Sequence, residues 1–242
     1  MQFAATPPHD GTLAKYYTIP EDFCFKLPAN ISLEERALVE PLSVAVHCAK
    51  LARITFGSSV LVLGVGPIGL LCCAVARALG SSKVIAVDIV DSRLLFARNY
   101  AATVTYRMES LSPEENASRI MSSTGIGEGA EIVIDATGAE ACIITGIHAL
   151  KRGGMFIQAG LGAAKITFPV AQLCSKEGSY RGSFRYGPGD YRIAVELLKQ
   201  ERISVKELIT HRYDFSEAEK AFENVEQRHG IKSIIYGPDT NQ

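Results

Sequence analysis

The sequence lacks an excess of charge of either sign. Its 242 residues contain 25 lysines and arginines against 26 aspartates and glutamates, which gives a formal net charge of −1. Proteins that bind nucleic acids through their phosphates show a clustered basic excess, and no such excess occurs here. We therefore predict that the chain does not bind nucleic acid.

Paired metal-binding or disulfide spacings are also missing. A disulfide framework or a zinc site would show repeated short Cys-x-x-Cys or His-x-x-x-His spacings. The six cysteines are unpaired in this sense and lie at positions 24, 48, 72, 73, 142 and 174. The histidines follow no such pattern either: His9, His47, His148, His211 and His229. We predict reduced thiols in a cytoplasmic protein, and histidines with structural or surface roles.

The first twelve residues lack both the basic start and the long apolar run of a secretory signal, so we expect none. One uncharged stretch, between Arg53 and Arg77, is long enough to resemble a membrane helix. Pro67 and its neighbouring glycines would interrupt a continuous helix there. We predict a buried strand, a glycine turn and a buried helix instead, and no membrane partner.

What the sequence does contain is a regular alternation of apolar strands and helices. Predicted strands cover 59–64, 83–89, 103–107, 131–137, 154–160, 179–184 and 232–237, and the proline-rich residues 1–36 are predicted as loops with short edge strands such as 14–19. Predicted helices begin at Pro41 and then cover 67–80, 91–101, 112–123, 139–150, 190–200 and 215–226. This alternation predicts an α/β fold with a doubly wound parallel sheet. Strand 179–184 would form its edge and favours a homo-oligomer.

The stretch Gly-Val-Gly-Pro-Ile-Gly at 64–69 lies between a predicted strand and a predicted helix. In that context the pattern G-x-G-x-x-G indicates a dinucleotide site. Gly64 permits the tight turn, Gly66 lets the backbone approach a pyrophosphate, and Gly69 lets the helix pack on the strand. The phosphates would accept from N–H groups at the helix N-terminus.

The next predicted strand ends in Asp88, 19 residues after Gly69. A carboxylate in this place accepts from both ribose hydroxyls of NAD and repels the extra phosphate of NADP. The sequence therefore favours NAD as cofactor, although a solvated strand end would also carry an aspartate. Arg93 is a candidate to stack near the adenine, and a surface ion pair is the alternative.

Further candidates lie at other strand ends, where ligands bind in such sheets. Residues 135–138, 159–162 and 184–187 bring Gly138, Gly160 and Gly162 to the rim, where they would allow close approach of a cofactor. Arg185 and Tyr186 add a cation and a hydroxyl to the same rim. For Arg185 the alternative is a plain ion pair.

Glu40 lies directly before Pro41 at the start of an apolar helix. A glutamate at this end of a helix interacts favourably with the helix dipole, and that is sufficient reason for it. The alternative is that Glu40 faces a metal or a substrate.

Taken together, seven segments resemble the zinc-dependent medium-chain polyol dehydrogenases of the sorbitol and xylitol dehydrogenase type, a group that includes fungal D-xylulose reductases. The segments are FAATPPHDGTLAKYY, PEDFCFKLP, VEPLSVAVH, GVGPIGLL, VDIVDSR, GSFRYGPGDY and VKELITHRY, and the resemblance covers essentially the whole sequence.

The resemblance implies that a Rossmann domain at 42–186 is flanked by remnants of a mostly-β, GroES-like catalytic domain at 1–41 and 187–242. It implies a nicotinamide site formed by Ile68, Asp88, Arg93, Ala159, Gly160, Leu161, Ser183, Phe184 and Arg185. It implies polyol contacts from Arg185 and Tyr186. Glu40 would reach the catalytic zinc directly or through its water.

The family's remaining zinc ligands precede the region that this sequence covers. A catalytic zinc normally needs three protein ligands and a water. We therefore expect the 242-residue chain to bind NAD, to hold no stoichiometric zinc and not to oxidise a polyol appreciably. Two alternatives to an NAD-dependent polyol dehydrogenase stay open. They are a non-catalytic NAD-binding or interaction subunit and a zinc-free reductase of the quinone reductase type.

Overall fold

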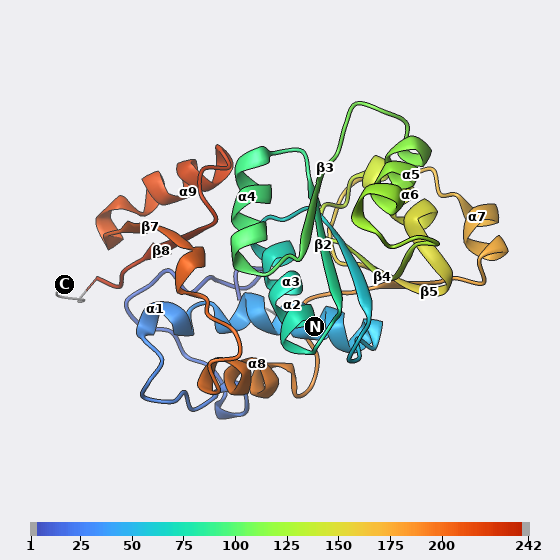
Figure 1. Ribbon diagram of the computed structural model, residues 1–242. Helices are drawn as coiled ribbons and strands as arrows, with labels where there is room; N and C mark the ends of the chain where they lie inside the picture. Colours follow the sequence, from blue (N-terminus) through green and yellow to red (C-terminus); the bar gives the residue numbers. More distant parts are fainter. Residues whose placement is uncertain (1–3, 239–242) are drawn as a thin grey trace. The chain divides into compact units, whose positions relative to one another are not determined.

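The computed structural model describes residues 4–238 and divides into two compact units (Figure 1). The larger unit runs from Val39 to Ile203. The smaller unit combines the residues up to Leu38 with those from Ser204 onward. The domain boundaries drawn from the sequence, 1–41, 42–186 and 187–242, stay predictions.

The larger unit is built on a parallel sheet of six strands in the order β3-β2-β1-β4-β5-β6. The strands are β1 (Ser59–Leu63), β2 (Lys83–Asp88), β3 (Val104–Arg107), β4 (Ala130–Asp135), β5 (Leu150–Gln158) and β6 (Ser179–Gly182). The predicted doubly wound sheet is thus confirmed, with 179–182 at its edge. Chain order reverses between β1 and β4, and in such sheets this is the point where ligands bind.

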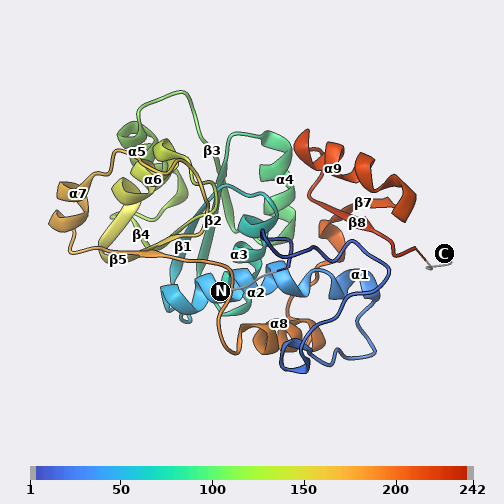
Figure 2. The ribbon, with the colours of Figure 1, turned by 180° about the vertical axis from the view of Figure 1, so that it is seen from behind.

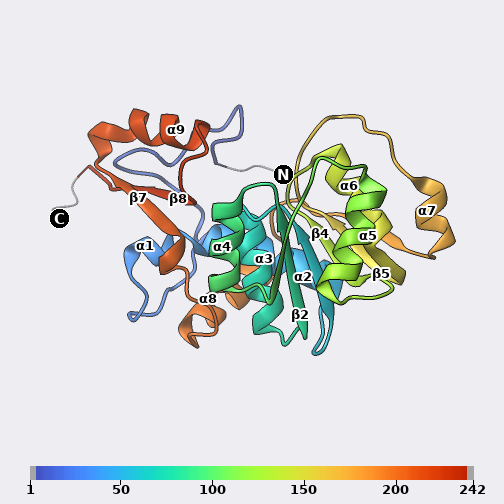
Figure 3. The same cartoon turned by 45° about the horizontal axis from the view of Figure 1, so that its top comes forward.

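Helices cover both faces of this sheet (Figure 3). They are α2 (Val39–Ala52), α3 (Pro67–Ala78), α4 (Asp91–Tyr100), α5 (Pro113–Thr124), α6 (Glu140–Ala149), α7 (Val170–Ser175) and α8 (Asp190–Lys199). Helices α2, α3 and α4 lie on one face and α5 and α6 on the other, while α8 packs against α2 (Figure 2). The central strands are apolar on both sides because helices bury both faces.

Local signals in the sequence explain several element ends. Ser112 and Glu115 form a capping box at the start of α5. Gly80, with φ of +87°, ends α3 as predicted. The uncharged stretch from Arg53 to Arg77 divides into β1, the glycine turn and most of α3, as expected. In the described part of the chain, no helix is both long and apolar enough to cross a bilayer.

The smaller unit contains a parallel strand pair, β7 (Ile209–Tyr213) and β8 (Lys232–Ile235), connected through α9 (Ala218–Glu226). Its short helix α1 (Leu33–Arg36) contributes Glu34. The Glu34 carboxylate accepts two hydrogen bonds from Arg212, at 2.7 and 2.8 Å, and one from Tyr236 at 2.6 Å. These bonds tie the N-terminal part of this unit to its C-terminal part.

Three expectations about local structure are wrong. Residues 14–19 form no strand; between residues 4 and 32 the regular structure is the 3₁₀ turn η1 (Glu21–Phe23). Pro41 is the third residue of α2 rather than the first, which a helix tolerates because its first four N–H groups have no partner within the helix. Strand β5 begins at Leu150, four residues earlier than predicted, and contains Gly153 with φ of +70°.

Candidate functional site

The turn that follows β1 contains two glycines that the protein itself requires. Gly64 has φ of +82°, and a Cβ there would lie 2.4 Å from the Thr137 methyl carbon. A Cβ on Gly69 would lie 1.9 Å from the carbonyl oxygen of Gly64. The N–H of Gly64 donates to the carbonyl of Val87 over 2.8 Å, so the turn is fixed to the end of β2.

Gly66, unlike Gly64 and Gly69, is not required by the packing of the protein itself. Its φ is −70°, a value open to any residue, and a Cβ there would meet no heavy atom within 4 Å. It caps the N-terminus of α3 without any side-chain hydrogen bond. Neither backbone strain nor packing explains a glycine here. A ligand that must approach the backbone closely does explain it, and a phosphate at a helix N-terminus is such a ligand.

Asp88 ends β2 beside this turn and is buried. One carboxylate oxygen accepts the N–H of Val65 at 2.9 Å. The other accepts the N–H groups of Ile89 and Val90, at 2.8 and 3.0 Å. Three backbone donors therefore hold the carboxylate at the switch point. A carboxylate offers about four acceptor positions, which leaves capacity for a ribose hydroxyl.

The loops after β4 and β5 are held together by Asp135, whose side chain is completely buried. Its carboxylate accepts from the Thr137 hydroxyl at 2.6 Å, the Gly138 N–H at 2.7 Å and the Gln158 amide at 2.6 Å. The Asp135 carbonyl accepts the N–H groups of Ala159 and Gly160. The sequence indicated the region 135–138, but nothing in it identified Asp135 as the anchor of both loops.

The glycines of these loops interlock with one another. A Cβ on Gly160 would lie 2.3 Å from the nitrogen of Gly138, and a Cβ on Gly162 would lie 1.9 Å from its oxygen. Gly138 has φ of +73° and would clash with Leu161 at 2.5 Å. The packing of the two loops is therefore sufficient reason for these glycines, and close approach of a cofactor is not needed to explain them.

Strand β6 leads into a loop that carries the other predicted site residues. Ser183 is buried and donates its N–H to the carbonyl of Gln158 at 2.8 Å, while Phe184 and Leu161 are exposed. Arg185 has φ of +54°, which is unusual for a residue other than glycine, and its guanidinium lies over the Phe184 ring, 5.8 Å from its centroid. Ile68 and Arg93 lie half-buried, at the start of α3 and of α4.

Glu40, in the first turn of α2, lies near a pair of phenols. The rings of Tyr186 and Tyr191 meet edge to face with centroids 4.8 Å apart. The pKa of Tyr191 is raised, by burial first, then by its hydrogen bond with Tyr186, and further by negative charge, including that of Glu40. The structure thus brings together Glu40, Tyr186 and Tyr191. The sequence reasoning missed Tyr191, although its position five residues after Tyr186, across a Gly-Pro-Gly turn, was a usable signal.

A catalytic zinc does not fit the side chains around Glu40. Tyr191 lies close enough to be influenced by the charge of Glu40, and a phenol is not a usual ligand of zinc. Within residues 4–238, no three histidine, cysteine, aspartate or glutamate side chains cluster closely enough to hold a metal ion. His47, on the same helix as Glu40, directs its Nδ1 to Asp190 at 2.8 Å.

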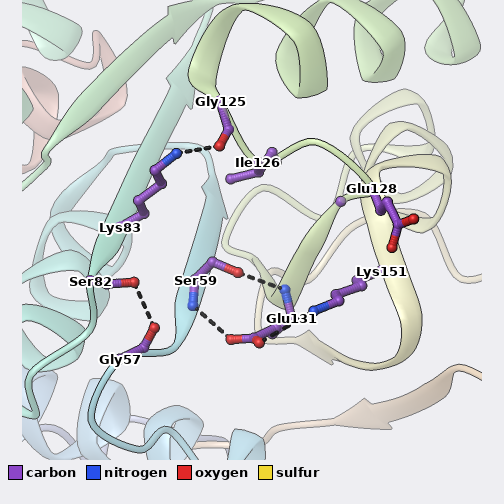
Figure 4. Close-up of a pocket in the computed structure, with 10 residues that line it drawn as sticks. Gly57, Ser59, Ser82, Lys83, Gly125, Ile126, Glu128, Glu131 and Lys151 are labelled. Atoms are coloured by element: carbon purple, nitrogen blue, oxygen red, sulfur yellow. Dashed lines mark hydrogen bonds and ion pairs between the residues drawn. The ribbon is translucent and has the colours of Figure 1, made fainter.

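A hollow of about 320 Å³ lies at the opposite, amino-terminal edge of the sheet (Figure 4). Three of its charged side chains, those of Lys83, Glu131 and Lys151, pair with the protein itself. Glu131 accepts the N–H of Ser59 at 3.0 Å and lies 3.6 Å from the Lys151 ammonium. Lys83 donates to the carbonyl of Gly125. Ligands bind at the carboxyl ends of the strands in sheets of this kind, so the candidate site is at the carboxyl edge.

Comparisons with known proteins concern the family and the fold of this chain. The sequence model of the family described as zinc-binding dehydrogenase matches residues 67–200. The chain is similar to D-xylulose reductase A of Aspergillus oryzae, with 58% identity over 239 residues, 99% of this chain and 67% of that protein. It is 56% identical over 240 residues to D-xylulose reductase A of Aspergillus niger, with the same two coverages. The chain thus spans about two thirds of the length of these relatives.

Two solved structures have the same fold over most of the chain. L-idonate 5-dehydrogenase from Escherichia coli matches with a TM-score of 0.85 and 27% identity, over 96% of this chain and 65% of that one. An alcohol dehydrogenase from Thermus sp. ATN1 matches with a TM-score of 0.84 and 26% identity, over 95% of this chain and 66% of that one.

Proposed function

We propose that this chain, which belongs to the zinc-binding dehydrogenase family, binds the cofactor and the polyol in an NAD-dependent oxidoreductase. Its relatives are named D-xylulose reductases, so the proposed reaction interconverts xylitol, or a sorbitol-like polyol, and the corresponding ketose. The observation that carries the proposal is the open backbone position at Gly66 beside the buried Asp88.

NAD, when bound, supplies the hydride acceptor, which is carbon 4 of its nicotinamide ring. Oxidation of a polyol to a ketose releases one hydride, which bound NAD would accept, and one proton, which would pass to the solvent. The chain's own residues bind and orient the two reactants. In the proposal, Gly66 and the N-terminus of α3 hold the pyrophosphate, and Asp88 accepts from a ribose hydroxyl.

Asp88 also selects between the two nicotinamide cofactors. A 2′-phosphate on the ribose would bring like charge within about 4 Å of the carboxylate, where two unit charges interact by roughly 4 kcal/mol at an effective dielectric constant of 20. In the proposal, Arg93 lies beside the adenine, and its cationic charge does not outweigh the repulsion at Asp88. We therefore expect NAD to bind more tightly than NADP.

The rim beyond the turn is proposed to position the reacting groups. Ile68, the backbone at 159–161 and the backbone at 183–185 would flank the nicotinamide ring. The Arg185 guanidinium and the Tyr186 phenol would donate hydrogen bonds to polyol hydroxyls. Because the donor set around Glu40 does not fit a catalytic zinc, we derive no step through a metal.

The poor fit of a catalytic zinc to the side chains around Glu40 also favours a second candidate function, a non-catalytic NAD-binding subunit. The polar side chains of Glu40, Arg185 and Tyr186 suit a polyol better than the apolar ring of a quinone, which argues against a zinc-free quinone reductase. In either candidate the protein is proposed to act in the cytoplasm and to associate through the exposed edge strand β6.

Three measurements on the purified 242-residue chain test the proposal. NADH and NADPH are titrated by calorimetry, xylitol oxidation is followed as NADH formation, and zinc is measured in the same sample. We expect NADH to bind at least about tenfold more tightly than NADPH, because a charge repulsion of even about 1.4 kcal/mol has that effect. We expect no stoichiometric zinc and no appreciable turnover. Equal affinity for the two cofactors would overturn the cofactor assignment. One zinc per chain with rapid turnover would show that other residues build a metal site.

A further inference from the structure

A buried carboxylate lies at the base of the loop that carries Arg185 and Tyr186. Asp190 is the first residue of α8, and its side chain has no exposed surface. Its carboxylate accepts from the Gly187 N–H at 2.6 Å and lies 2.8 Å from His47 Nδ1 and 2.5 Å from Lys50 Nζ. A buried charge is stable only when such partners satisfy it. Here burial by itself would raise the pKa of Asp190, and the bonds from Lys50, Gly187 and His47 lower it instead.

Two of these partners belong to α2, the helix that begins with Val39 and Glu40. His47 follows Glu40 by seven residues, about two helical turns or roughly 10 Å. Side chains at that spacing lie on the same face of a helix. Asp190 therefore fixes the loop to the same face of the helix on which Glu40 lies.

The loop itself could not hold this geometry unaided. Arg185 and Gly189 both have positive φ, at +54° and +86°. A residue other than glycine in that region is strained, and it stays there only when its surroundings determine its position. A Cβ at Gly187 would lie 3.2 Å from the His47 ring, so the loop also approaches α2 closely.

Asp190 is placed to position the phenols of Tyr186 and Tyr191. Tyr191 directly follows Asp190, and Tyr186 directly precedes Gly187, whose N–H the carboxylate accepts. The two rings meet edge to face at 4.8 Å. Burial and a hydrogen bond with Tyr186 both raise the pKa of Tyr191, so the two phenols also interact through their hydroxyls. Both phenols thus flank the segment that Asp190 holds.

We propose that Asp190 is a positioning residue for polyol recognition, which holds Tyr186 and Tyr191 at a fixed place relative to Glu40 through His47 and Lys50. Tyr191 then joins Tyr186 in forming the polyol-binding wall. This inference rests on the proposed function for the identity of the ligand. The geometry of the anchor can be tested separately from that function.

The test uses the whole chain labelled with 3-fluorotyrosine and observed by ¹⁹F NMR. The nine tyrosines give nine signals, and Tyr→Phe variants assign those of residues 186, 191 and 236. In Asp190→Asn we expect the signals of Tyr186 and Tyr191 to shift by more than their line width, and that of Tyr236 to stay. The matched control is Glu34→Gln, which removes the charge that Arg212 and Tyr236 bind in the smaller unit. It should shift the signal of Tyr236 alone.

The ligand is tested in the same samples by adding xylitol in the presence of NADH. In the unsubstituted chain xylitol should shift the signals of Tyr186 and Tyr191, and Asp190→Asn should weaken that binding about tenfold, the effect of roughly one lost hydrogen bond. If xylitol moves neither signal in the unsubstituted chain, the polyol site is wrong while the anchor is still decided by the variant.

A purely structural role for Asp190 would lower the melting temperature and leave both phenol signals in place, and that result would overturn the proposal. If Asp190→Asn does not fold, Lys50→Met replaces it, because the Lys50 side chain is 45% exposed and its loss leaves two partners on the carboxylate. A smaller shift of the same two signals is expected. Unchanged signals in Lys50→Met would count against the anchor.

Discussion

The two glycine-rich regions at the carboxyl edge of the sheet resemble each other in sequence and differ in what requires the glycines. In the loops after β4 and β5, Gly138, Gly160 and Gly162 each leave no space for a side chain, because the loops occupy it themselves. In the turn after β1, Gly66 has an ordinary φ and open space where its side chain would be. At the N-terminus of a helix, such an open glycine leaves room for a phosphate from outside the chain.

The largest expected loss of stability comes from substituting a glycine in the loops after β4 and β5. Gly162→Ala would place a Cβ 1.9 Å from the Gly138 oxygen, which is backbone and cannot rotate away. We expect a loss of about 3 kcal/mol in the free energy of unfolding, the upper range of overpacking in a tight interior. Urea denaturation followed by circular dichroism measures it.

The matched control for this variant is Gly182→Ala, in the edge strand, where a Cβ meets no atom within 4 Å. Its unfolding free energy should stay within about 0.5 kcal/mol of the unsubstituted chain, as at other surface positions. If the two variants were equally stable, the contrast between the glycine regions would not hold.

Gly66→Ala should have the opposite signature. Alanine in place of glycine at a helix N-cap costs at most about 1 kcal/mol of stability. A methyl group at the proposed pyrophosphate position should weaken NADH binding by at least about tenfold, since it excludes about one hydrogen bond's contribution. Calorimetric titration together with urea denaturation shows both effects. Unchanged affinity in a stable variant would remove the reason for assigning this turn to a cofactor.

Asp88→Ala tests whether the Asp88 carboxylate serves the cofactor or only the fold. We expect NADH to bind several-fold more weakly, and NADPH to gain relative to it, because the charge that repels the 2′-phosphate is gone. Competitive titration of the two cofactors measures the ratio. A ratio identical to that of the unsubstituted chain would mean that Asp88 serves the backbone N–H groups of Val65, Ile89 and Val90 alone.

Glu34, unlike Asp88, is a carboxylate whose partners are side chains of the protein itself. Its substitution should have the smallest effect of the series. The hydrogen bond from Arg212, followed by that from Tyr236, lowers the pKa of Glu34 to about 2 from an ordinary value of 4.5. A lowered carboxyl pKa stabilises the fold fully above about pH 4.5, and the stabilisation is lost as the pH falls toward 2.

Glu34→Gln should therefore reduce stability at pH 6 by at most about 1 kcal/mol, the range of partly exposed ion pairs. It should also flatten the decline in stability between pH 4.5 and 3, measured by thermal unfolding at several pH values, with the exposed Glu226→Gln as control. NADH affinity should not change. An unaltered pH profile would contradict the assigned role of Glu34.

The part of the fold that sequence could predict is the part set by local pattern. The alternation of strands and helices, the turn at 64–69 and the capping box at Ser112 each depend on neighbouring residues. Strand β7 escaped notice because His211 and Arg212 interrupt its apolar pattern, and its partner β8 begins 19 residues after β7 ends. Residues 14–19 had a strand-like composition, but they have no neighbouring strand to pair with in the described structure.

The candidate site divides in the same way. The glycine motif and Asp88 lie within 25 residues of one another, so a spacing rule can find them. The bond between His47 and Asp190 joins residues 143 apart, and no periodicity carries that information. Asp135 and Gln158 were missed for the same reason, because an anchor between two loops is visible only after the strands have been placed side by side.

The smaller unit has a consequence for the order in which the chain folds during its synthesis. Glu34 emerges from the ribosome early, whereas Arg212 and Tyr236, its partners, are made after the whole segment 39–203. At a translation rate of about 5–20 residues per second, the N-terminal segment waits roughly 10–40 s for those partners. During that interval Val39–Ile203 can complete its sheet, while the exposed aromatic side chains between Tyr16 and Phe25 are open to chaperones.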